Sequence, residues 1–297
     1  LNGGAGIDRV RTSGDGDYVI TDTSISGPTT GTLIAIEAAD ITGGDGDNVL
    51  DASAFSGDTT LWGGGGRDVS TGGLGNDWLN GNGSPDTVIG GRGDDLVLGG
   101  TSGDVLNGSS GNDSVDGGDG SDRVFGGSGS DVLNGGTGAD RLNGQGGSGD
   151  VVLGNDGDDT VQGGTGDDVL DGGIGFDELR ESGNVDFLLE DNTLGGQGSD
   201  QISSFEAARL TGGGDANVID ATGFSGPVTL RGSGGNDLLR SSSFDDLLLG
   251  GNGDDTFESG SGLDTLKGGN GTDRAKTSGD GDYVITDTTF TGPASTG

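Results

Sequence analysis

The sequence contains no histidine, cysteine or methionine among its 297 residues. The absence of cysteine excludes disulfides and thiolate metal sites, and the absence of histidine excludes imidazole ligands and any Ser-His or Cys-His nucleophile. Lysine and arginine number only 13 against 50 acidic residues, which gives a net charge of −37. Because a surface this acidic repels phosphate backbones and anionic lipids, we expect no nucleic acid as partner and no membrane insertion.

Long hydrophobic runs are also missing. No apolar run approaches the roughly 18 residues that span a bilayer, and no signal peptide is recognisable. Leu, Ile, Val and Phe supply only about a fifth of the chain, a content typical of disordered, highly charged sequences. The chain opens on Leu1 without a methionine, and both ends interrupt a repeating pattern. We therefore expect a segment of a longer protein.

What the sequence does contain is 73 glycines, arranged with the acids in a nine-residue period. The stretch GGTGDDVLD at 163–171 gives the pattern Gly-Gly-x-Gly-x-Asp-x-apolar-x. Thirteen consecutive units fill residues 63–180, and only the unit that starts at Gly144 has an extra residue. The eighth position is Leu or Val in every unit except the first, which has Ser70. Five further units fill residues 232–276. Regularity of this kind argues against disorder.

Every unit places an aspartate at the sixth position, and an isolated unit near the start of the chain does the same. These aspartates are the candidate metal ligands: Asp8, Asp68, Asp77, Asp86, Asp95, Asp104, Asp113, Asp122, Asp131, Asp140, Asp150, Asp159, Asp168, Asp177, Asp237, Asp246, Asp255, Asp264 and Asp273.

Each position of the unit has a physical interpretation. Glycines at the first, second and fourth positions allow backbone angles that side chains forbid, which predicts a tight turn. The apolar eighth residue then lies in a short strand. One unit cannot bury this residue alone, but stacked half-coils of a solenoid can. Two units would form one coil, with successive coils about 4.8 Å apart and the eighth positions facing inward.

Such a stack needs a further source of stability. Burial of one apolar residue in nine offsets only part of the entropy that is lost when nine residues are ordered. Stacking also brings aspartates of like charge to within one strand spacing of each other. A cation between the turns resolves both problems. Carboxylate and carbonyl oxygens, with no nitrogen or sulfur ligand, select Ca²⁺ over transition metals, and a flexible turn favours Ca²⁺ over Mg²⁺.

The repeat resembles the glycine- and aspartate-rich nonapeptide of RTX (repeats-in-toxin) proteins, the hemolysin-type calcium-binding repeat. The resemblance covers residues 63–180 and 232–276 densely. It implies an all-β, right-handed parallel β-roll (β-solenoid), in which each Ca²⁺ lies between turns one coil apart. Sixth-position carboxylates and turn carbonyls would hold the ion. If each unit pairs with the second unit after it, the two runs give roughly 14 Ca²⁺ sites.

Some units depart from the pattern, and we expect their sites to be weaker. Ser84 and Pro85 interrupt the unit at Gly81, Ser102 replaces a fourth-position glycine, and the units at Ser241 and Ser259 lose glycines. The extra residue near Gln145–Gly147 is expected to make one turn bulge.

The sequence also contains a longer repeat, which includes the nonapeptide runs. Residues 12–42 align without gaps to residues 181–211, and each copy is followed by a unit with asparagine in the aspartate position, Asn48 or Asn217. We interpret these asparagines as caps of calcium-free turns, and weakened sites are the alternative.

The two levels of repetition predict the domain organisation. It consists of the end of a preceding run (1–11), a spacer (12–62), the thirteen-unit roll (63–180), a second spacer (181–231), the five-unit roll (232–276) and the start of a further spacer (277–297).

The spacers contain β-branched and aromatic runs that predict strands at residues 18–21, 33–36, 187–190 and 202–205. We expect wider, metal-poor coils that continue the same solenoid, with Phe55 and Phe224 in their cores. A small hairpin domain between the rolls is the alternative.

No catalytic constellation is recognisable, and we predict that the segment is not an enzyme. Paired acids such as Asp94–Asp95 recur throughout, so no pair stands out as a glycosidase acid and nucleophile. The fifth-position acid either adds to the field of the calcium site or faces solvent. Trp62 and Trp78 are able to stack on sugars, but two tryptophans that do not match in position favour a packing role.

The leading functional hypothesis is a calcium-dependent structural segment of a large secreted or cell-surface bacterial protein, such as an adhesin, surface-layer or fibre protein. It would be unfolded in a calcium-poor cytosol and would fold outside the cell. Calcium ions are the expected partners, with copies of the chain or other surface components as further candidates. Export by a type I secretion system is implied by the family resemblance alone.

The alternative is the non-catalytic calcium-binding region of a secreted enzyme or toxin. Direct binding of polysaccharide or ice is a third hypothesis, but the sequence has neither a flat threonine ladder nor many aromatic residues to support it. The flanking sequence discriminates between the first two hypotheses, since more blocks favour a fibre and a catalytic domain favours an enzyme.

Overall fold

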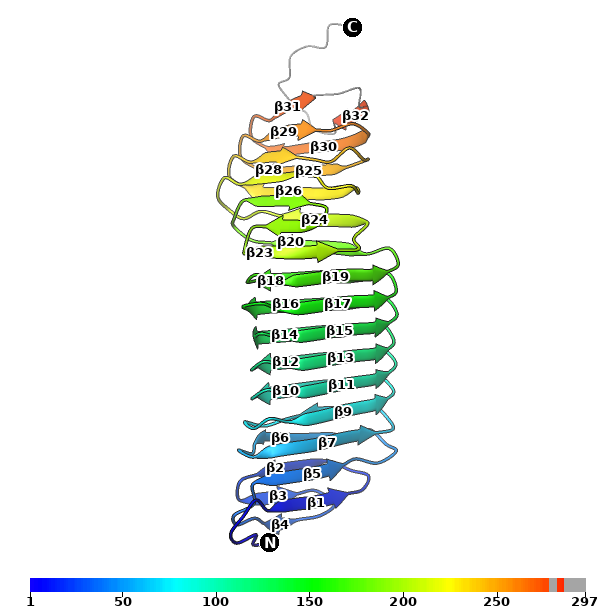
Figure 1. The fold of residues 1–297 in the computed structure, drawn as a ribbon, viewed down its shortest axis with the longest axis vertical. Helices are drawn as coiled ribbons and strands as arrows, with labels where there is room; N and C mark the ends of the chain where they lie inside the picture. The colour runs from blue at the N-terminus through cyan, green and yellow to red at the C-terminus, as the bar shows by residue number, and fades with distance from the viewer. Residues whose placement is uncertain (278–281, 286–297) are drawn as a thin grey trace, which may run out of the picture. The chain divides into compact units, whose positions relative to one another are not determined.

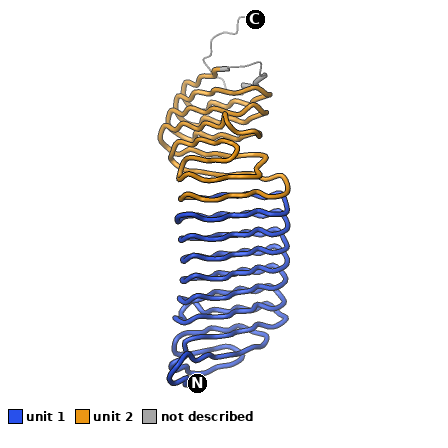
Figure 2. Tube along the Cα trace, in the orientation of Figure 1, with its two compact units in different colours: residues 1–163 blue, residues 164–297 orange. Residues whose placement is uncertain are grey.

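A computed structural model describes residues 1–277 and 282–285 and consists of β-strands joined by tight turns (Figure 1). The chain falls into two compact units, residues 1–163 and 164–297 (Figure 2). No helix long and apolar enough to cross a membrane occurs in the described ranges. The spacer start predicted at 277–297 lies largely outside the described residues.

The first unit contains seventeen complete strands in sequence order. They are β1 (Arg9–Ser13), β2 (Tyr18–Thr21), β3 (Ser24–Ser26), β4 (Gly31–Thr32), β5 (Ala38–Thr42), β6 (Val49–Ala54), β7 (Asp58–Gly64), β8 (Val69–Thr71), β9 (Trp78–Gly83), β10 (Thr87–Arg92), β11 (Leu96–Thr101), β12 (Val105–Ser110), β13 (Ser114–Asp119), β14 (Arg123–Gly129), β15 (Val132–Thr137), β16 (Arg141–Gly147) and β17 (Val151–Asp156). The next strand, β18 (Thr160–Thr165), crosses the boundary between the two units.

Two sheets make up the first unit. One has the order β1-β5-β7-β9-β11-β13-β15-β17, and the other has β4-β3-β2-β6-β8-β10-β12-β14-β16. Odd and even strands of the nonapeptide run alternate between the sheets, so each coil of two units contributes one strand to each. Partners are parallel and lie one coil apart, as in Val97 opposite Val115 and Leu106 opposite Val124. The predicted parallel β-roll is therefore confirmed.

The second unit is built in the same way. Its strands are β19 (Val169–Ile174), β20 (Glu178–Ser182), β21 (Phe187–Glu190), β22 (Thr193–Gly195), β23 (Ser199–Ser203), β24 (Ala207–Thr211), β25 (Val218–Gly223), β26 (Val228–Gly234), β27 (Leu238–Arg240), β28 (Leu247–Asn252), β29 (Thr256–Ser259), β30 (Leu263–Asn270), β31 (Arg274–Thr277) and β32 (Asp282–Ile285). They form the orders β19-β23-β22-β21-β25-β27-β29-β31 and β20-β24-β26-β28-β30-β32.

The core of each unit lies between its two sheets and is a column of eighth-position side chains. Leu79, Val97 and Leu133 are fully buried, and the residues on either side of each point outward. Ser70 occupies the same inward position and is equally buried, although it adds no apolar surface. Side chains alternate between the two faces along each strand, and the strand recurs every nine residues. Each repeat unit therefore places one side chain at the centre of its strand into the core.

The spacers combine parallel coils with short antiparallel segments. β2, β3 and β4 pair antiparallel in the first unit, and β21, β22 and β23 do so in the second. The flanking strands β5 and β24 still pair in parallel with the neighbouring coils. Phe55 and Phe224 are both buried, as expected.

Two predicted spacer strands differ from the structure. Strands occur at 18–21 and 187–190 as expected, but residues 33–36 hold only an isolated bridge at Ile34 after β4 has ended, and β23 ends at Ser203 before the predicted 205. A left-handed residue stands at the equivalent place in each copy, Ala35 (φ 51) and Ser204 (φ 59). A strand cannot pass through this conformation.

Candidate metal centre

The sixth-position aspartates lie at the turn that precedes each strand of the rolls. All of those predicted are buried except Asp8, which is only partly covered. Because units alternate between the sheets, the aspartates of the first unit form two rows, one at the start of the strands of each sheet. Asp68, Asp86 and Asp104 belong to one row, and Asp77, Asp95 and Asp113 belong to the other.

Within a row, one carboxylate oxygen joins each coil to the previous one. The backbone N–H of Asp86 donates to Oδ1 of Asp104 at 2.7 Å, and the N–H of Asp104 donates to Oδ1 of Asp122 at 2.7 Å. In the other row, Asp95 donates to Oδ1 of Asp113 at 2.8 Å. The carboxylates therefore satisfy buried amides that a turn of this shape leaves unpaired.

The second oxygen, Oδ2, is buried and accepts no hydrogen bond from the described residues at many of these positions. It faces the first glycine of its own unit and the carbonyl of the next coil. A Cβ at Gly99 would lie 2.6 Å from Oδ2 of Asp104 and 2.5 Å from the carbonyl oxygen of Gly117. The aspartates that share this unpartnered Oδ2 include Asp8, Asp68, Asp86, Asp95, Asp104, Asp113, Asp122, Asp131, Asp140, Asp237, Asp255 and Asp264.

Burial makes the ionised form of these carboxyls costly. It raises the pKa of Asp95 from 3.8 to about 8 and the pKa of Asp104 to about 7. The backbone N–H that each accepts lowers the pKa, and the negative aspartates one coil away raise it further. Rows of buried carboxylates therefore stay ionised at neutral pH only where a positive charge compensates them.

The donor set fits a calcium ion. Buried carboxylate and carbonyl oxygens face the same small space, and all of them are hard ligands. Among the described residues, no group of three or more acidic side chains lies close enough to hold an ion by itself. Backbone carbonyls of the glycine turn would therefore supply most of the ligands, and the sixth-position Oδ2 would supply the charge. An ion bound there would neutralise the row and link neighbouring coils.

The fifth-position side chains form a second ladder that runs in the opposite direction. Asp94 accepts the N–H of Asn112 one coil later at 2.8 Å, and Asn76 accepts the N–H of Asp94 at 2.9 Å. These side chains are exposed. The fifth-position acids therefore face solvent at the edge of the turn, one of the two roles considered for them.

Several units satisfy Oδ2 without an ion. At Asp77, Oδ2 accepts the N–H of Gly73 at 2.5 Å, while Oδ1 accepts both the N–H and the hydroxyl of Thr59. At Asp246, the hydroxyl of Ser242, which replaces a second-position glycine, lies 3.1 Å from each carboxylate oxygen. A donor that occupies Oδ2, the N–H of Gly73 at Asp77 or the hydroxyl of Ser242 at Asp246, competes with a cation, so these two positions are the poorest candidates in the rows.

The asparagine turns have the contacts that a cap requires. Asn48 Oδ1 accepts the N–H of Gly44 at 2.6 Å, and Asn217 Oδ1 accepts the N–H of Gly213 at 2.8 Å. The one side-chain oxygen is thus used by its own turn.

Substituted turns keep the backbone shape of the glycine turns. In the unit at Gly90, the second and fourth glycines have φ values of 118 and 105, and the replacing serines Ser84 (φ 78) and Ser102 (φ 87) adopt the same left-handed region. The residue inserted in the unit at Gly144 lengthens its turn without breaking the row. Oδ1 of Asp150 still accepts the N–H of Asp131 at 2.8 Å.

Three acidic residues that sequence analysis did not select also occupy the sixth-position role. Asp200 is buried, its Oδ1 accepts the N–H of Asp168 at 3.0 Å, and burial raises its pKa to about 6. Residues 195–203 read GGQGSDQIS, a complete nonapeptide inside the predicted spacer, and this match was sufficient to identify Asp200. Glu37 and Glu206 accept the N–H of Asp8 and Asp177 at 2.9 and 2.8 Å. Their shared position in the aligned spacers is the only indication in the sequence.

Coils stacked on buried, glycine-bounded carboxylates define a metal-binding β-roll. The family model of the RTX calcium-binding nonapeptide repeat matches residues 62–97, 71–106, 98–133, 125–148, 145–179, 231–266, 240–275 and 249–285. These matches cover more than half of the chain, and the chain therefore belongs to this family. None of the curated proteins matches the chain. The repeats bind calcium, and a β-solenoid made of such repeats is typical of a structural calcium-binding region of a secreted protein rather than of a catalytic domain.

Proposed function

We propose that the chain is a calcium-dependent structural segment of a large secreted or cell-surface bacterial protein of the adhesin, surface-layer or fibre type. The observation that carries this proposal is the pair of aspartate rows in the first unit, whose Oδ2 atoms face glycine carbonyls of the next coil. A fold that buries so many like charges along its length depends on cations for its stability.

The mechanism is linkage between calcium binding and folding. Without calcium the carboxylates repel each other, and the sparse core does not offset the entropy of ordering the chain. Extracellular calcium is millimolar and exceeds the dissociation constants of about 10⁻⁴–10⁻³ M that are typical of extracellular modules, so mass action favours the folded roll. Roughly 14 bound ions would offset most of the net charge of −37.

Repetition of the blocks supports a structural role. In both spacers the same aspartate accepts the same backbone amide: Asp17 accepts from Val49 at 3.0 Å, and its counterpart Asp186 accepts from Val218 at 2.7 Å. Asp22 and its counterpart Asp191 likewise accept from Ser56 and Ser225. Such a plan extends the protein by whole blocks and builds no enclosed active site, which favours the fibre hypothesis over an enzyme.

Far-ultraviolet circular dichroism tests the proposal. We expect the spectrum of an unfolded chain in EDTA and a β spectrum in millimolar Ca²⁺, with Mg²⁺ at the same concentration as the matched control that restores little structure. A β spectrum that is unchanged by EDTA would contradict the proposal.

A further inference from the structure

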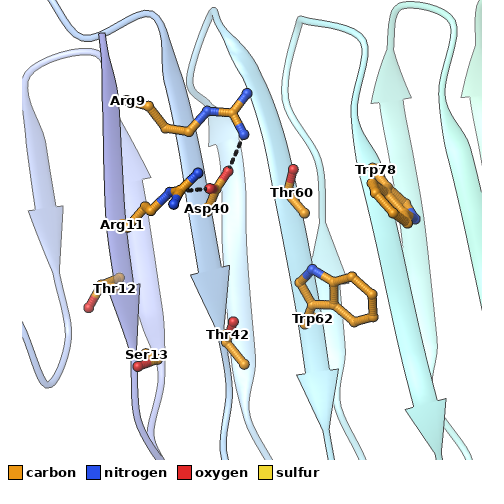
Figure 3. A pocket seen from close by; sticks show the side chains of 9 residues that line it. All are labelled: Arg9, Arg11, Thr12, Ser13, Asp40, Thr42, Thr60, Trp62 and Trp78. Atoms are coloured by element: carbon orange, nitrogen blue, oxygen red, sulfur yellow. Dashed lines mark hydrogen bonds and ion pairs between the residues drawn. The ribbon is translucent and has the colours of Figure 1, made fainter.

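The outer face of one sheet in the first unit carries a cluster that the calcium sites do not use. Four neighbouring strands, β1, β5, β7 and β9, place two rows of side chains across this face (Figure 3). The first row is Arg11, Asp40, Thr60 and Trp78, and the second is Ser13, Thr42, Trp62 and Asn80. The residues between the rows, such as Leu61 and Leu79, are fully buried, so both rows face outward.

The two tryptophans form a tilted pair at one end of this cluster. Their ring centroids are 5.5 Å apart and the ring planes differ by 54°. Trp78 remains 44% exposed. The rings pack against each other on the outer face of the sheet, outside the core between the two sheets. Two large rings kept at the surface have the arrangement of a ligand platform.

Two arginines lie at the other end of the cluster. Arg9 Nη1 is 2.6 Å from Oδ1 of Asp40, and Arg11 Nε is 2.8 Å from Oδ2. Asp40 thus fixes both guanidinium groups with one oxygen each, while most of their remaining N–H donors face solvent. The side chain of Arg11 is 76% exposed. Among the residues that line the adjacent hollow, two cations stand against one anion.

The space between the two ends is an open hollow of about 680 Å³, whose lining includes the hydroxyl-bearing residues Ser13, Thr42 and Thr60. From β1 to β9 the cluster crosses three strand spacings, or about 14 Å. An elongated ligand that lies across the strands would meet an aromatic face, then hydroxyl groups, then guanidinium donors.

The second unit shows that the β-roll does not need this cluster. Its corresponding rows are Arg180, Arg209, Thr229 and Leu247, and Ser182, Thr211, Arg231 and Leu249. Arg231 stands in the position of Trp62, Leu247 in that of Trp78 and Arg209 in that of Asp40. Because the same strands form without either tryptophan, the pair in the first unit is not a requirement of folding.

We propose that this face binds an acidic polysaccharide. Aromatic faces stack on the apolar C–H faces of sugar rings, threonine and serine hydroxyls exchange hydrogen bonds with sugar hydroxyls, and guanidinium groups pair with carboxylates in a bidentate manner. The two guanidinium groups favour an acidic sugar over a neutral one, because they pair with its carboxylates. The polar, shallow lining suits a carbohydrate better than the apolar anchors of a protein interface.

Intrinsic fluorescence tests the proposal directly, because Trp62 and Trp78 are the only two tryptophans in the chain. The full chain in millimolar Ca²⁺ is titrated with hyaluronan hexasaccharide, chondroitin sulfate hexasaccharide and neutral cellohexaose. We expect saturable quenching by an acidic oligosaccharide, weakened by salt, and at least tenfold weaker binding of cellohexaose.

Two variants separate the contributions. Trp78→Leu introduces the residue that the second unit has at this position, without a change in charge, and should weaken binding about tenfold or more, as should Arg11→Gln. Thr229→Ala, on the corresponding face of the second unit, is the control and should leave binding unchanged. Circular dichroism of each sample establishes that the β-roll is folded, so a failure of calcium-dependent folding is distinguished from a failure of binding. Isothermal titration calorimetry measures binding by the tryptophan variant independently of fluorescence.

The other outcomes overturn the proposal. These are no binding of either acidic oligosaccharide, equal binding of cellohexaose, or equal binding by Trp78→Leu. Concentration-dependent self-association that Trp78→Leu abolishes, detected by sedimentation equilibrium in the absence of any saccharide binding, would instead assign the cluster to contact between copies.

Discussion

Each sixth-position aspartate uses its two oxygens for different purposes. Oδ1 of Asp95 accepts the N–H of Asp77 at 2.8 Å, whereas Oδ2 accepts no hydrogen bond within the described residues. The adjacent Asp94 is exposed and accepts the N–H of Asn112. Asp95 is therefore buried with one oxygen that accepts no hydrogen bond from the described residues, whereas its neighbour Asp94 is exposed. Substitution of each in turn gives a matched pair of variants.

Asp95→Asn keeps an oxygen that can accept the N–H of Asp77 but removes the charged oxygen from the cradle. We expect the loss of about one bound Ca²⁺ per chain and a higher calcium midpoint for folding. Asp94→Asn makes the same change in charge on the exposed side and should leave both quantities nearly unchanged. Calcium titration calorimetry with circular dichroism measures both, and equal effects of the two variants would argue against the assignment of ligands.

The raised pKa values predict an unusual pH dependence of the metal-free chain. Burial raises the pKa of Asp95 from 3.8 to about 8 and that of Asp104 to about 7. Between about pH 4 and pH 8 the folded form therefore holds more protons than the unfolded form, and its stability falls as the pH rises.

We accordingly expect the chain in EDTA to gain β structure as the pH is lowered from about 8 to about 5. The calcium midpoint should rise over the same range, because protons and Ca²⁺ compete for the same oxygens. Circular dichroism at a series of pH values follows both quantities. Loss of β structure on acidification in EDTA would contradict this prediction, as would a calcium midpoint that does not change with pH.

Most single residues of the candidate site could be predicted from the sequence, because the period fixes them. The exceptions mark where periodicity stops being informative. Asp200 belongs to a complete nonapeptide, but this unit lies apart from the two continuous runs, and its strand β23 pairs in parallel with β19 and antiparallel with β22. Glu37 and Glu206 accept the hydrogen bond that a sixth-position aspartate accepts elsewhere, although a glutamate side chain is longer. No nonapeptide surrounds either residue.

At the scale of the strand, the nonapeptide tolerates any apolar residue of suitable size at its centre. Leu133 in β15 and Val152 in β17 are equivalent and fully buried. The two sheets approach each other mainly through these positions, so each contributes a large share of the packing in its coil. The adjacent seventh position is outside the core, as Val132 is 45% exposed.

Leu133→Ala should lower the free energy of unfolding by about 2–5 kcal/mol, since the rigid coils above and below prevent the cavity from collapsing. Val132→Ala, one residue away, should change it by about 0.5 kcal/mol or less. Urea unfolding in saturating Ca²⁺ measures the difference. An equal loss in the free energy of unfolding for the two variants would mean that the eighth position does not form the core.

The spacer strands show the limit of pattern at this scale. β-branched and aromatic runs correctly predict β2 and β21, but they do not reveal where a strand ends. The left-handed residues Ala35 and Ser204 stand at equivalent places after β4 and β23, and neither alanine nor serine is a residue type that indicates such a conformation.

At the scale of the whole molecule, net charge and fold are two aspects of one property. Composition alone suggests a disordered chain, because apolar residues are few and the net charge is −37. The nine-residue period argues against disorder, because it places the aspartates whose repulsion opposes folding in register on successive coils. A cation bound between coils converts that repulsion into cross-linking. Under the proposed function, the same property would make the chain respond to the difference between a calcium-poor and a calcium-rich compartment.

Anomalous diffraction from crystals grown in Ca²⁺ tests the central claim most directly, because it locates the ions themselves. We predict a row of anomalous peaks along each edge of the thirteen-unit run, each peak in contact with Oδ2 of a sixth-position aspartate such as Asp104, and none at the Asn48 turn. Peaks confined to exposed fifth-position acids such as Asp94, with none beside the buried aspartates, would contradict it.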